Sequence, residues 1–256
     1  MSVIHSPRVT VFPDAHIAAR VVAIRLAHAL RDKPNLVFGL ATGRTPIALY
    51  EELARVTAAR GLDWSQATTF NLDEFVGVSH QDPGSYRRFM EEHLFRHTNL
   101  RPENINFLRG MANQKAECQR YEGAIAQAGG IDIQILGIGT NGHIGFNEPG
   151  PRLEARTHLV TLKPESRRSN AALFAGQLDR VPTEALSMGM ATILQARSLI
   201  LLAHGETKAG CIAAVVHGPL TTELPASFLQ LHHDVDLILD TAAASALTAE
   251  AKLVER

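Results

Sequence analysis

The segment 137–150, GIGTNGHIGFNEPG, gathers side chains that could move protons into one glycine-rich loop. It follows Ile131–Leu136, the strongest strand pattern in the chain. His143 can exchange protons near neutral pH, and Asn141 and Glu148 flank it and could fix its tautomer or charge. The glycines permit tight turns and close approach to a ligand. A lone histidine is usually structural, but this combination in one short loop favours function.

Two adjacent carboxylates, Asp73 and Glu74, stand in the segment 70–77, FNLDEFVG, directly after another apolar run. One carboxylate of such a pair can act as a general base while its neighbour orients it or pairs with a cation. The alternative is that Asp73 or Glu74 caps the helix that follows. For an isolated Asp-Glu pair this structural role is favoured.

A candidate phosphate site lies in the segment 39–46, GLATGRTP, at the end of the first apolar run. Thr45 is suited to the N-cap of a helix and Pro46 to its first turn. Unpaired amides at such a helix start bind anions, although a plain strand–turn–helix junction explains these residues equally well. The pattern is neither a Walker A loop nor GxGxxG, so it does not indicate a nucleotide.

Lys208, in the segment 203–209, AHGETKA, is a second candidate for binding an anion. We expect it in the first turn of a helix, where the helix dipole does not favour a cation. A bound anion would relieve that mismatch, but a solvated surface position is the commoner fate of a lysine.

The remaining histidines do not predict a metal site. His93 and His97 are four residues apart and could share a helix face, but no third ligand is evident, and structural zinc usually takes four. His232 and His233 are adjacent and would point apart in regular structure. We expect no metal ion and no other cofactor.

Short apolar runs alternate with amphipathic segments along the chain. Strands are predicted at Leu36–Leu40, Thr68–Leu72, Ile131–Gly137, His158–Leu162, Ser198–Ala203 and Val235–Leu239. Helices are predicted near Asp14–Arg31, Pro46–Ala59, Ser85–Arg96, Gln114–Ala128, Thr183–Gln195 and Glu206–His217. This alternation predicts one α/β domain over residues 1–256, a three-layer α/β/α fold with a mostly parallel, Rossmann-like sheet. Ligands of such sheets bind beyond the carboxyl ends of the strands, where the segments above lie.

The composition argues against several classes of protein. Hydrophobic residues make up 45% and charged residues 20%, which is typical of a globular chain rather than a disordered one. A balance of 25 Lys+Arg against 26 Asp+Glu argues against a nucleic-acid partner. No stretch approaches the roughly 20 apolar residues that cross a membrane, and no signal peptide is evident. Cys118 and Cys211 suggest no disulfide framework, so we expect a cytoplasmic protein.

Six blocks carry a family resemblance, in order from residue 39 to residue 232. They are GLATGRTP, TFNLDEFVG followed by HQDPGSYRRFM, GIGTNGHIGFNEPG, ALSMGMATI, GETKA and PASFLQLH. Together they resemble the glucosamine-6-phosphate deaminase family. The resemblance implies a parallel α/β core and conversion of glucosamine 6-phosphate and water into fructose 6-phosphate and ammonia, in amino-sugar catabolism. An amino-sugar phosphate is then the expected partner, and a homo-oligomer is left open.

The resemblance also implies roles for individual residues. Asp73 matches the family's base, which moves a proton between C2 and C1. His143 matches the residue that helps open the pyranose ring, with Glu148 and Asn141 as its partners. The positions that match the family's phosphate-binding residues are Thr42, Gly43 and Lys208.

The chain departs from the family pattern at several positions. Some members have Asp where Asn141 stands, and because Asn cannot relay a proton, we expect it to orient His143. Many members place a phosphate-binding arginine at the position that aligns with Ala172, and Arg167 or Arg168 are the candidates to replace it.

A further departure concerns regulation. Members activated by N-acetylglucosamine 6-phosphate use basic residues in the stretch that matches 151–161, where this chain has His158 and Val160. We therefore expect no activation by that compound, with Arg152 and Arg156 as the cations that could reach its phosphate instead.

Other functions remain as alternatives. A deaminase for galactosamine 6-phosphate or another amino-sugar phosphate would share these motifs. A 6-phosphogluconolactonase shares the fold but typically carries a GHTASLFP-like block where this chain has GHIGFNE at 142–148. A sugar-phosphate sensor domain would tend to lose Asp73, His143 and Glu148, which this chain keeps.

Overall fold

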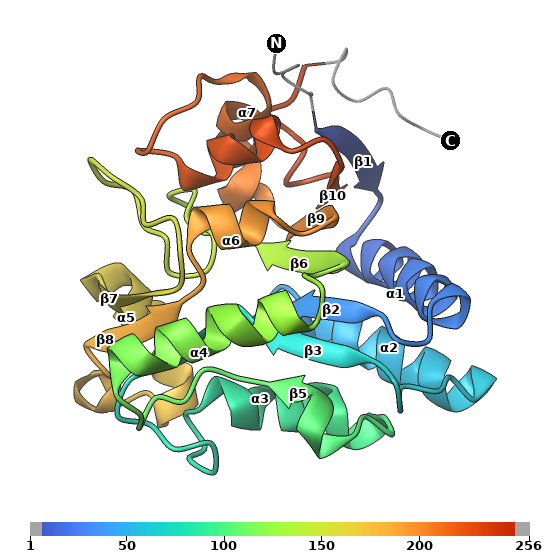
Figure 1. The fold of residues 1–256 in the computed structure, drawn as a ribbon. Helices are drawn as coiled ribbons and strands as arrows, with labels where there is room; N and C mark the ends of the chain where they lie inside the picture. The colour runs from blue at the N-terminus through green and yellow to red at the C-terminus, as the bar shows by residue number, and fades with distance from the viewer. Residues whose placement is uncertain (1–6, 249–256) are drawn as a thin grey trace.

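A seven-stranded parallel sheet forms the centre of the molecule (Figure 1). The computed structural model describes residues 7–248. The strand order is β1-β10-β9-β6-β2-β3-β5. The strands are β1 (Arg8–Phe12), β2 (Val37–Leu40), β3 (Thr68–Asn71), β5 (Ile105–Asn106), β6 (Ile133–Gly137), β9 (Ser198–Ala203) and β10 (Val235–Asp240). Because β1 pairs with β10, the sheet joins the two ends of the chain. The predicted α/β fold is confirmed.

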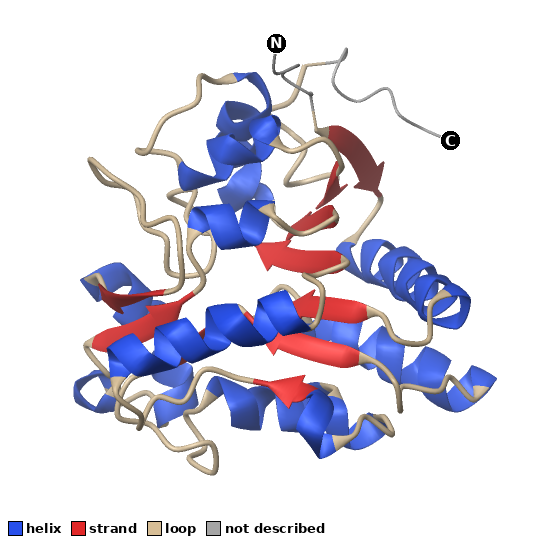
Figure 2. Ribbon diagram, viewed as in Figure 1, coloured by secondary structure: helices blue, strands red, loops and turns tan. Residues whose placement is uncertain are grey.

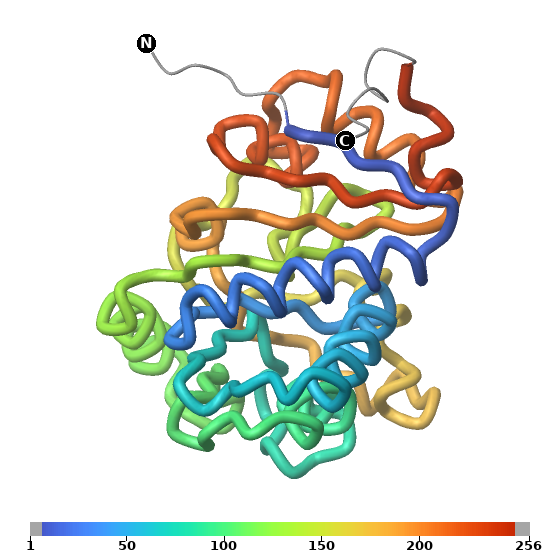
Figure 3. Tube along the Cα trace, turned by 90° about the vertical axis from the view of Figure 1, so that its right-hand side faces the viewer, coloured from blue at the N-terminus to red at the C-terminus, as the bar shows by residue number. Residues whose placement is uncertain are grey.

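Helices cover both faces of this sheet, which gives three layers (Figure 2). Side chains of a strand alternate between the faces. In β9, Ile200 and Leu202 pack into the core under α1, α2 and α3, whereas Leu199 and Leu201 pack into a second core under α4, α6 and α7. These helices are α1 (Ala15–Asp32), α2 (Ile47–Arg60), α3 (Tyr86–His93), α4 (Gln114–Gln127), α6 (Met190–Leu194) and α7 (Ala209–His217). Figure 3 shows α1 lying across one face of the sheet.

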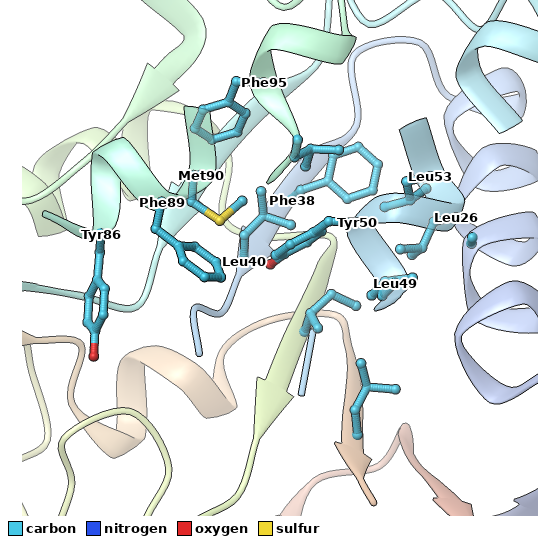
Figure 4. Packing of buried hydrophobic residues seen from close by; sticks show 14 of the residues in the cluster. Leu26, Phe38, Leu40, Leu49, Tyr50, Leu53, Tyr86, Phe89, Met90 and Phe95 are labelled. Carbon is cyan, nitrogen blue, oxygen red and sulfur yellow. The ribbon is translucent and has the colours of Figure 1, made fainter. Parts of the chain in front are cut away.

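Helix α2 fixes the carboxyl end of β2. Tyr50 is fully buried, and its hydroxyl donates to the carbonyl oxygen of Ala41, the first residue after the strand, at 2.5 Å. Its ring belongs to the same core as Phe38 and Leu40 (Figure 4). The turn that carries Thr42 is therefore held between a buried strand and a buried helix face.

A second, antiparallel sheet stands beside the carboxyl ends of the first, in the order β4-β8-β7. Its strands are β4 (Asp73–Phe75), β8 (Glu184–Ser187) and β7 (His158–Thr161). The helix predicted at Thr183–Gln195 is wrong over its first half, because β8 pairs there with both β4 and β7. Only α6 remains of that helix. Tertiary pairing has overridden a local pattern that also fits a helix.

Several helix boundaries differ from the predicted ones. The predicted cap of α2 at Thr45 is wrong, since Pro46 occupies the N-cap without a side-chain hydrogen bond. The helix predicted at Ser85–Arg96 stops at His93, and a short 3-10 turn, η1 (Phe95–His97), follows. The predicted start of the last helix is the 3-10 turn η5 (Glu206–Lys208), which leads into α7.

Five elements complete the chain in the described range. They are α5 (Pro164–Asn170), the 3-10 turns η2 (Pro102–Asn104), η3 (Ala171–Phe174) and η4 (Leu178–Arg180), and the 3-10 segment η6 (Pro225–Leu231), which precedes β10. No helix within residues 7–248 combines the length and the apolar character needed to cross a membrane.

Candidate active site

A cleft of about 890 Å³ opens at the carboxyl ends of β9, β6, β2 and β3, which are neighbours in the sheet. The loops that follow these strands carry the residues singled out in the sequence. Those that line the cleft are Thr42, Gly43, Asp73, Asn141, His143 and Lys208. Glu148 lies behind His143 rather than at the cleft surface. The structure therefore brings the predicted residues together at the predicted edge of the sheet.

Asp73 begins β4 and is only 6% exposed, although it lines the cleft. Its Oδ1 atom is buried and has no hydrogen-bond partner among residues 7–248. Burial, together with the negative charge of Glu74, raises the pKa of Asp73 to about 8. A carboxyl group with this pKa is suited to exchanging a proton near neutral pH.

Glu74 has a different role, because adjacent residues of a strand point to opposite sides. Its carboxylate accepts from the backbone N–H groups of Phe75, Tyr86 and Arg87 and from the hydroxyl of Ser85. Two of these N–H groups belong to the first turn of α3, so Glu74 caps that helix. Burial raises the pKa of Glu74, whereas the four donors oppose that rise because they stabilise the ionised form. The structural alternative is thus correct for Glu74, and Asp73 is left facing the cleft.

The loop that carries His143 closes on itself. The N–H of Gly139 donates to the carbonyl oxygen of His143 at 3.0 Å, and the N–H of Gly142 donates to that of Gly139 at 3.1 Å. The imidazole ring packs directly on Gly139, where an added Cβ atom would lie 2.4 Å from the ring Cε1 atom. Gly139 is therefore required for space beneath the ring.

Glu148 anchors this histidine from behind. Its Oε1 atom lies 3.3 Å from Nδ1 of His143 and accepts from the hydroxyl of Ser166 at 2.5 Å. Its Oε2 atom accepts from Nδ2 of Asn141 at 2.8 Å. Burial raises the pKa of Glu148, but His143, Ser166 and Asn141 outweigh it and lower the pKa to about 2. Glu148 is therefore a fixed negative charge beside the imidazole. Asn141 also accepts from the backbone N–H of His143, which fits the predicted orienting role.

Ser166 was not singled out in the sequence. It is 4% exposed, lies in α5 and reaches Glu148 from a segment distant in sequence. A serine in a helical pattern carries no signal for such a contact. Asn170, which accepts from the hydroxyl of Tyr86 at 2.8 Å, also lines the cleft and was likewise missed.

The anion-binding candidates line the same cleft. Gly43 has a φ of 99°, a conformation that favours glycine, in the turn between β2 and α2. Lys208 is half-buried, and its Nζ atom donates to the carbonyl oxygen of Ile138 at 2.7 Å. Burial lowers the pKa of Lys208, which means that its charge is poorly solvated. The surface-lysine alternative is wrong, since the side chain lines the cleft.

Neither candidate replacement for the expected arginine lines the cleft. Ala172 does line it. Arg167 donates to the carbonyl oxygens of Leu178 and Val181, and Arg168 pairs with Glu165 at 2.6 Å. The suggestion that one of them replaces the arginine is therefore wrong for this conformation. Another arginine, Arg44, lines the cleft and was overlooked because it looked like a plain loop residue.

The stretch 151–161, which matches the effector site of activated family members, offers few cations that are free to bind a phosphate. His158 interacts through Nδ1 with the carbonyl oxygen of Arg156 at 3.0 Å, and burial lowers the pKa of His158. The guanidinium of Arg156 donates to Gln195 at 3.0 Å and lies 3.4 Å from Glu122. Of Arg152 and Arg156, the two arginines that could reach an effector phosphate, only Arg152 has no ion pair within residues 7–248.

The two histidine pairs, His93/His97 and His232/His233, are not arranged as predicted. Leu94 ends α3 between His93 and His97, so the pair does not share a regular helix face. His232 and His233 do not point apart as predicted, because their rings stack with centroids 4.7 Å apart. Within the described range, no group of three His, Cys, Asp or Glu residues is arranged to hold a metal ion.

The fold and the cleft define a class of protein. Residues 14–238 match the family model described as glucosamine-6-phosphate isomerases/6-phosphogluconolactonase, and the chain belongs to that family. Within it, the chain is 48% identical to glucosamine-6-phosphate deaminase 2 of Giardia intestinalis, over 88% of this chain and 86% of the relative. It is 47% identical to glucosamine-6-phosphate deaminase of Halothermothrix orenii, over 94% and 100% of the two chains.

Solved structures of a deaminase and of a 6-phosphogluconolactonase superpose on this chain. A monomeric glucosamine-6-phosphate deaminase superposes with a TM-score of 0.90 at 40% identity, covering 93% of this chain and 99% of the relative. A 6-phosphogluconolactonase from Trypanosoma cruzi superposes with a TM-score of 0.75 at 21% identity, covering 97% and 99%. At that identity the second similarity shows the fold alone.

Proposed function

We propose that this chain is an enzyme that converts glucosamine 6-phosphate and water into fructose 6-phosphate and ammonia. The observation that carries the proposal is the pairing, in one cleft, of a buried carboxyl group at Asp73 with a histidine backed by the Glu148 carboxylate. The deaminases to which the chain is 47–48% identical support the same reaction.

Each step of this reaction has a suitable residue. His143 takes the proton of the O1 hydroxyl and returns one to O5, which opens the pyranose ring. Asp73, once ionised, removes the proton on C2 and returns it to C1, while the amino group gives up a proton and O1 gains one, which gives a C2 imine beside a C1 hydroxyl. Water then adds to C2, and ammonia leaves as the ketone forms. The positive amino group of the substrate favours ionisation of Asp73 by its charge, which offsets the effect of burial.

The phosphate is proposed to lie at the part of the cleft formed by Thr42, Gly43 and Lys208. The turn supplies backbone amides near the start of α2, and the lysine supplies a charge. When the phosphate is bound there, C1 and C2 of the sugar can reach the carboxyl group of Asp73 and the imidazole of His143. Asn141 and Glu148 act through His143 and are positioning residues.

A panel of substrates tests the proposal. Purified protein is assayed for ammonia and ketose-phosphate release from glucosamine 6-phosphate, galactosamine 6-phosphate and mannosamine 6-phosphate, and for hydrolysis of 6-phosphogluconolactone. We expect ammonia and fructose 6-phosphate from the first compound, and at least a 10²-fold loss of turnover in Asp73→Asn if the carboxylate is the base. If ammonia is released mainly from another amino-sugar phosphate, that compound replaces glucosamine 6-phosphate as the proposed substrate. Hydrolysis of the lactone without any release of ammonia would overturn the proposal.

The proposed domain organisation, cellular location and oligomeric state follow from the same interpretation of the chain as a deaminase. We take the chain as one catalytic domain that acts in the cytoplasm, in keeping with two free cysteines, Cys118 and Cys211. The sequence left a homo-oligomer open, and one similar deaminase is described as monomeric. Light scattering of the purified protein decides between the two states.

A further inference from the structure

We propose that Arg44 is a second phosphate-binding cation of this cleft and sets its preference for phosphorylated sugars. The inference rests on the proposed function above. Arg44 follows Gly43 in the turn between β2 and α2, lines the cleft and is exposed. None of the ion pairs formed within residues 7–248 includes it. Its charge is therefore available to a ligand.

The charges around the cleft leave a phosphate under-neutralised without this arginine. A phosphate ester carries about −1.5 to −2 charges at pH 7, whereas Lys208 supplies one positive charge. His204 also lines the cleft, but burial lowers its pKa, which favours the neutral imidazole. Ala172 supplies no charge.

The carboxylates of Glu165 and Glu92 each have an arginine partner other than Arg44. Glu165 pairs with Arg168 at 2.6 Å, and Glu92 pairs with Arg88 at 2.8 Å. Both carboxylates line the cleft, and both are already partly neutralised by an arginine of their own helix. An incoming phosphate therefore offers Arg44 a counter-charge that the free protein does not.

The sheet places the two cations on either side of one loop. Arg44 follows β2 and Lys208 follows β9, and these strands are the two neighbours of β6. Two strand spacings, about 10 Å, separate β2 from β9. Long side chains from the loops that follow these two strands can reach a single phosphate above the segment after β6. Because a guanidinium offers paired N–H groups, Arg44 can hold two phosphate oxygens at once.

The experiment compares Arg44→Ala, Arg44→Lys and wild type by steady-state kinetics on glucosamine 6-phosphate and by calorimetric titration with inorganic phosphate. Arg44→Ala should raise KM about 10-fold or more while kcat changes little, as expected when an interaction present in both ground and transition states is lost. The KM of Arg44→Lys should lie between the KM of wild type and that of Arg44→Ala. Affinity for inorganic phosphate should fall in the same order.

The control is Arg31→Ala, which removes the same charge. Arg31 is exposed at the end of α1, next to the amino end of β2 and hence at the opposite edge of the sheet from the cleft. Wild-type KM and phosphate affinity in Arg44→Ala, beside a clear loss in Lys208→Ala, would overturn the inference. If wild type releases no ammonia from any amino-sugar phosphate, the proposed function fails, while the phosphate titration still tests Arg44 on its own.

Discussion

The buried carboxyl group of Asp73 should make the stability of this protein depend on pH in a defined direction. In the folded chain its pKa is raised to about 8, whereas an unfolded chain gives aspartate a pKa of about 3.9. Folding therefore favours the protonated form. The resulting stabilisation is fully present below about pH 4 and is lost as the pH rises through 8.

The substitution Asp73→Asn isolates this effect, because asparagine has a similar size and does not titrate. Between pH 5 and pH 7 the unfolded wild type is ionised at this position and the folded wild type is not. Each pH unit in that window costs wild type about 1.4 kcal/mol relative to the variant, or about 2.7 kcal/mol in all. For a chain of this size the gain in Tm of the variant should be about 5–11 °C larger at pH 7 than at pH 5.

Paired thermal and urea unfolding curves of both proteins at pH 5, 6 and 7 measure this difference. Asp63→Asn is the matched control, since Asp63 is exposed and accepts hydrogen bonds from the N–H of Ser65 and from Asn99. Those bonds lower the pKa of Asp63, so removing its carboxylate should not stabilise the protein as pH rises. An equal Tm difference at pH 5 and pH 7 for Asp73→Asn would mean that Asp73 is already ionised at pH 5, and the argument from burial would be wrong.

Three further results are expected. Lys208→Ala should raise KM for the sugar phosphate by roughly 10- to 100-fold, the scale of a lost charge-assisted hydrogen bond, and a wild-type KM at moderate salt would refute this. Gly139→Ala should displace the His143 ring and lower kcat at least about 10-fold with a smaller change in KM. Its control is Gly210→Ala, where an added Cβ meets no atom within 4 Å. N-acetylglucosamine 6-phosphate should leave a hyperbolic rate curve unchanged, because burial lowers the pKa of His158 and favours its neutral form. A sigmoidal curve that this compound makes hyperbolic would contradict the last expectation.

Sequence patterns predicted the five inner strands of the parallel sheet, β10, β9, β6, β2 and β3, because each is a short and mostly buried run. The run Ser198–Ala203 is an example, since five of its six residues are buried and it became β9 with unchanged bounds. The two edge strands were missed, because β1 is mostly not buried and β5 has only two residues. The second sheet was harder to predict. Glu184–Ser187 forms a strand only because β4 and β7 lie on either side of it, and no local pattern encodes those neighbours.

The candidate site shows the same division. His143, Asn141 and Glu148 were predictable because one continuous loop carries them all. Ser166 and Arg44 were not, because their contacts arise from the fold. Ser166 meets Glu148 through the placement of α5, and Arg44 lines the same cleft as Lys208 because the fold brings together the loops after β2 and β9.

The Asp73–Glu74 pair shows how two adjacent carboxyl groups can both be buried, although burial makes their ionisation unfavourable. Both side chains are buried, and ionising a buried carboxyl group is unfavourable unless it is hydrogen-bonded. Glu74 meets that condition with four donors at the start of α3, which makes it part of the scaffold and holds β4 against the helix. The same short strand then aims Asp73 the opposite way, with Oδ1 unpaired, toward the cleft. Glu74 thus fixes β4 in the scaffold, and its negative charge adds to the burial that raises the pKa of Asp73.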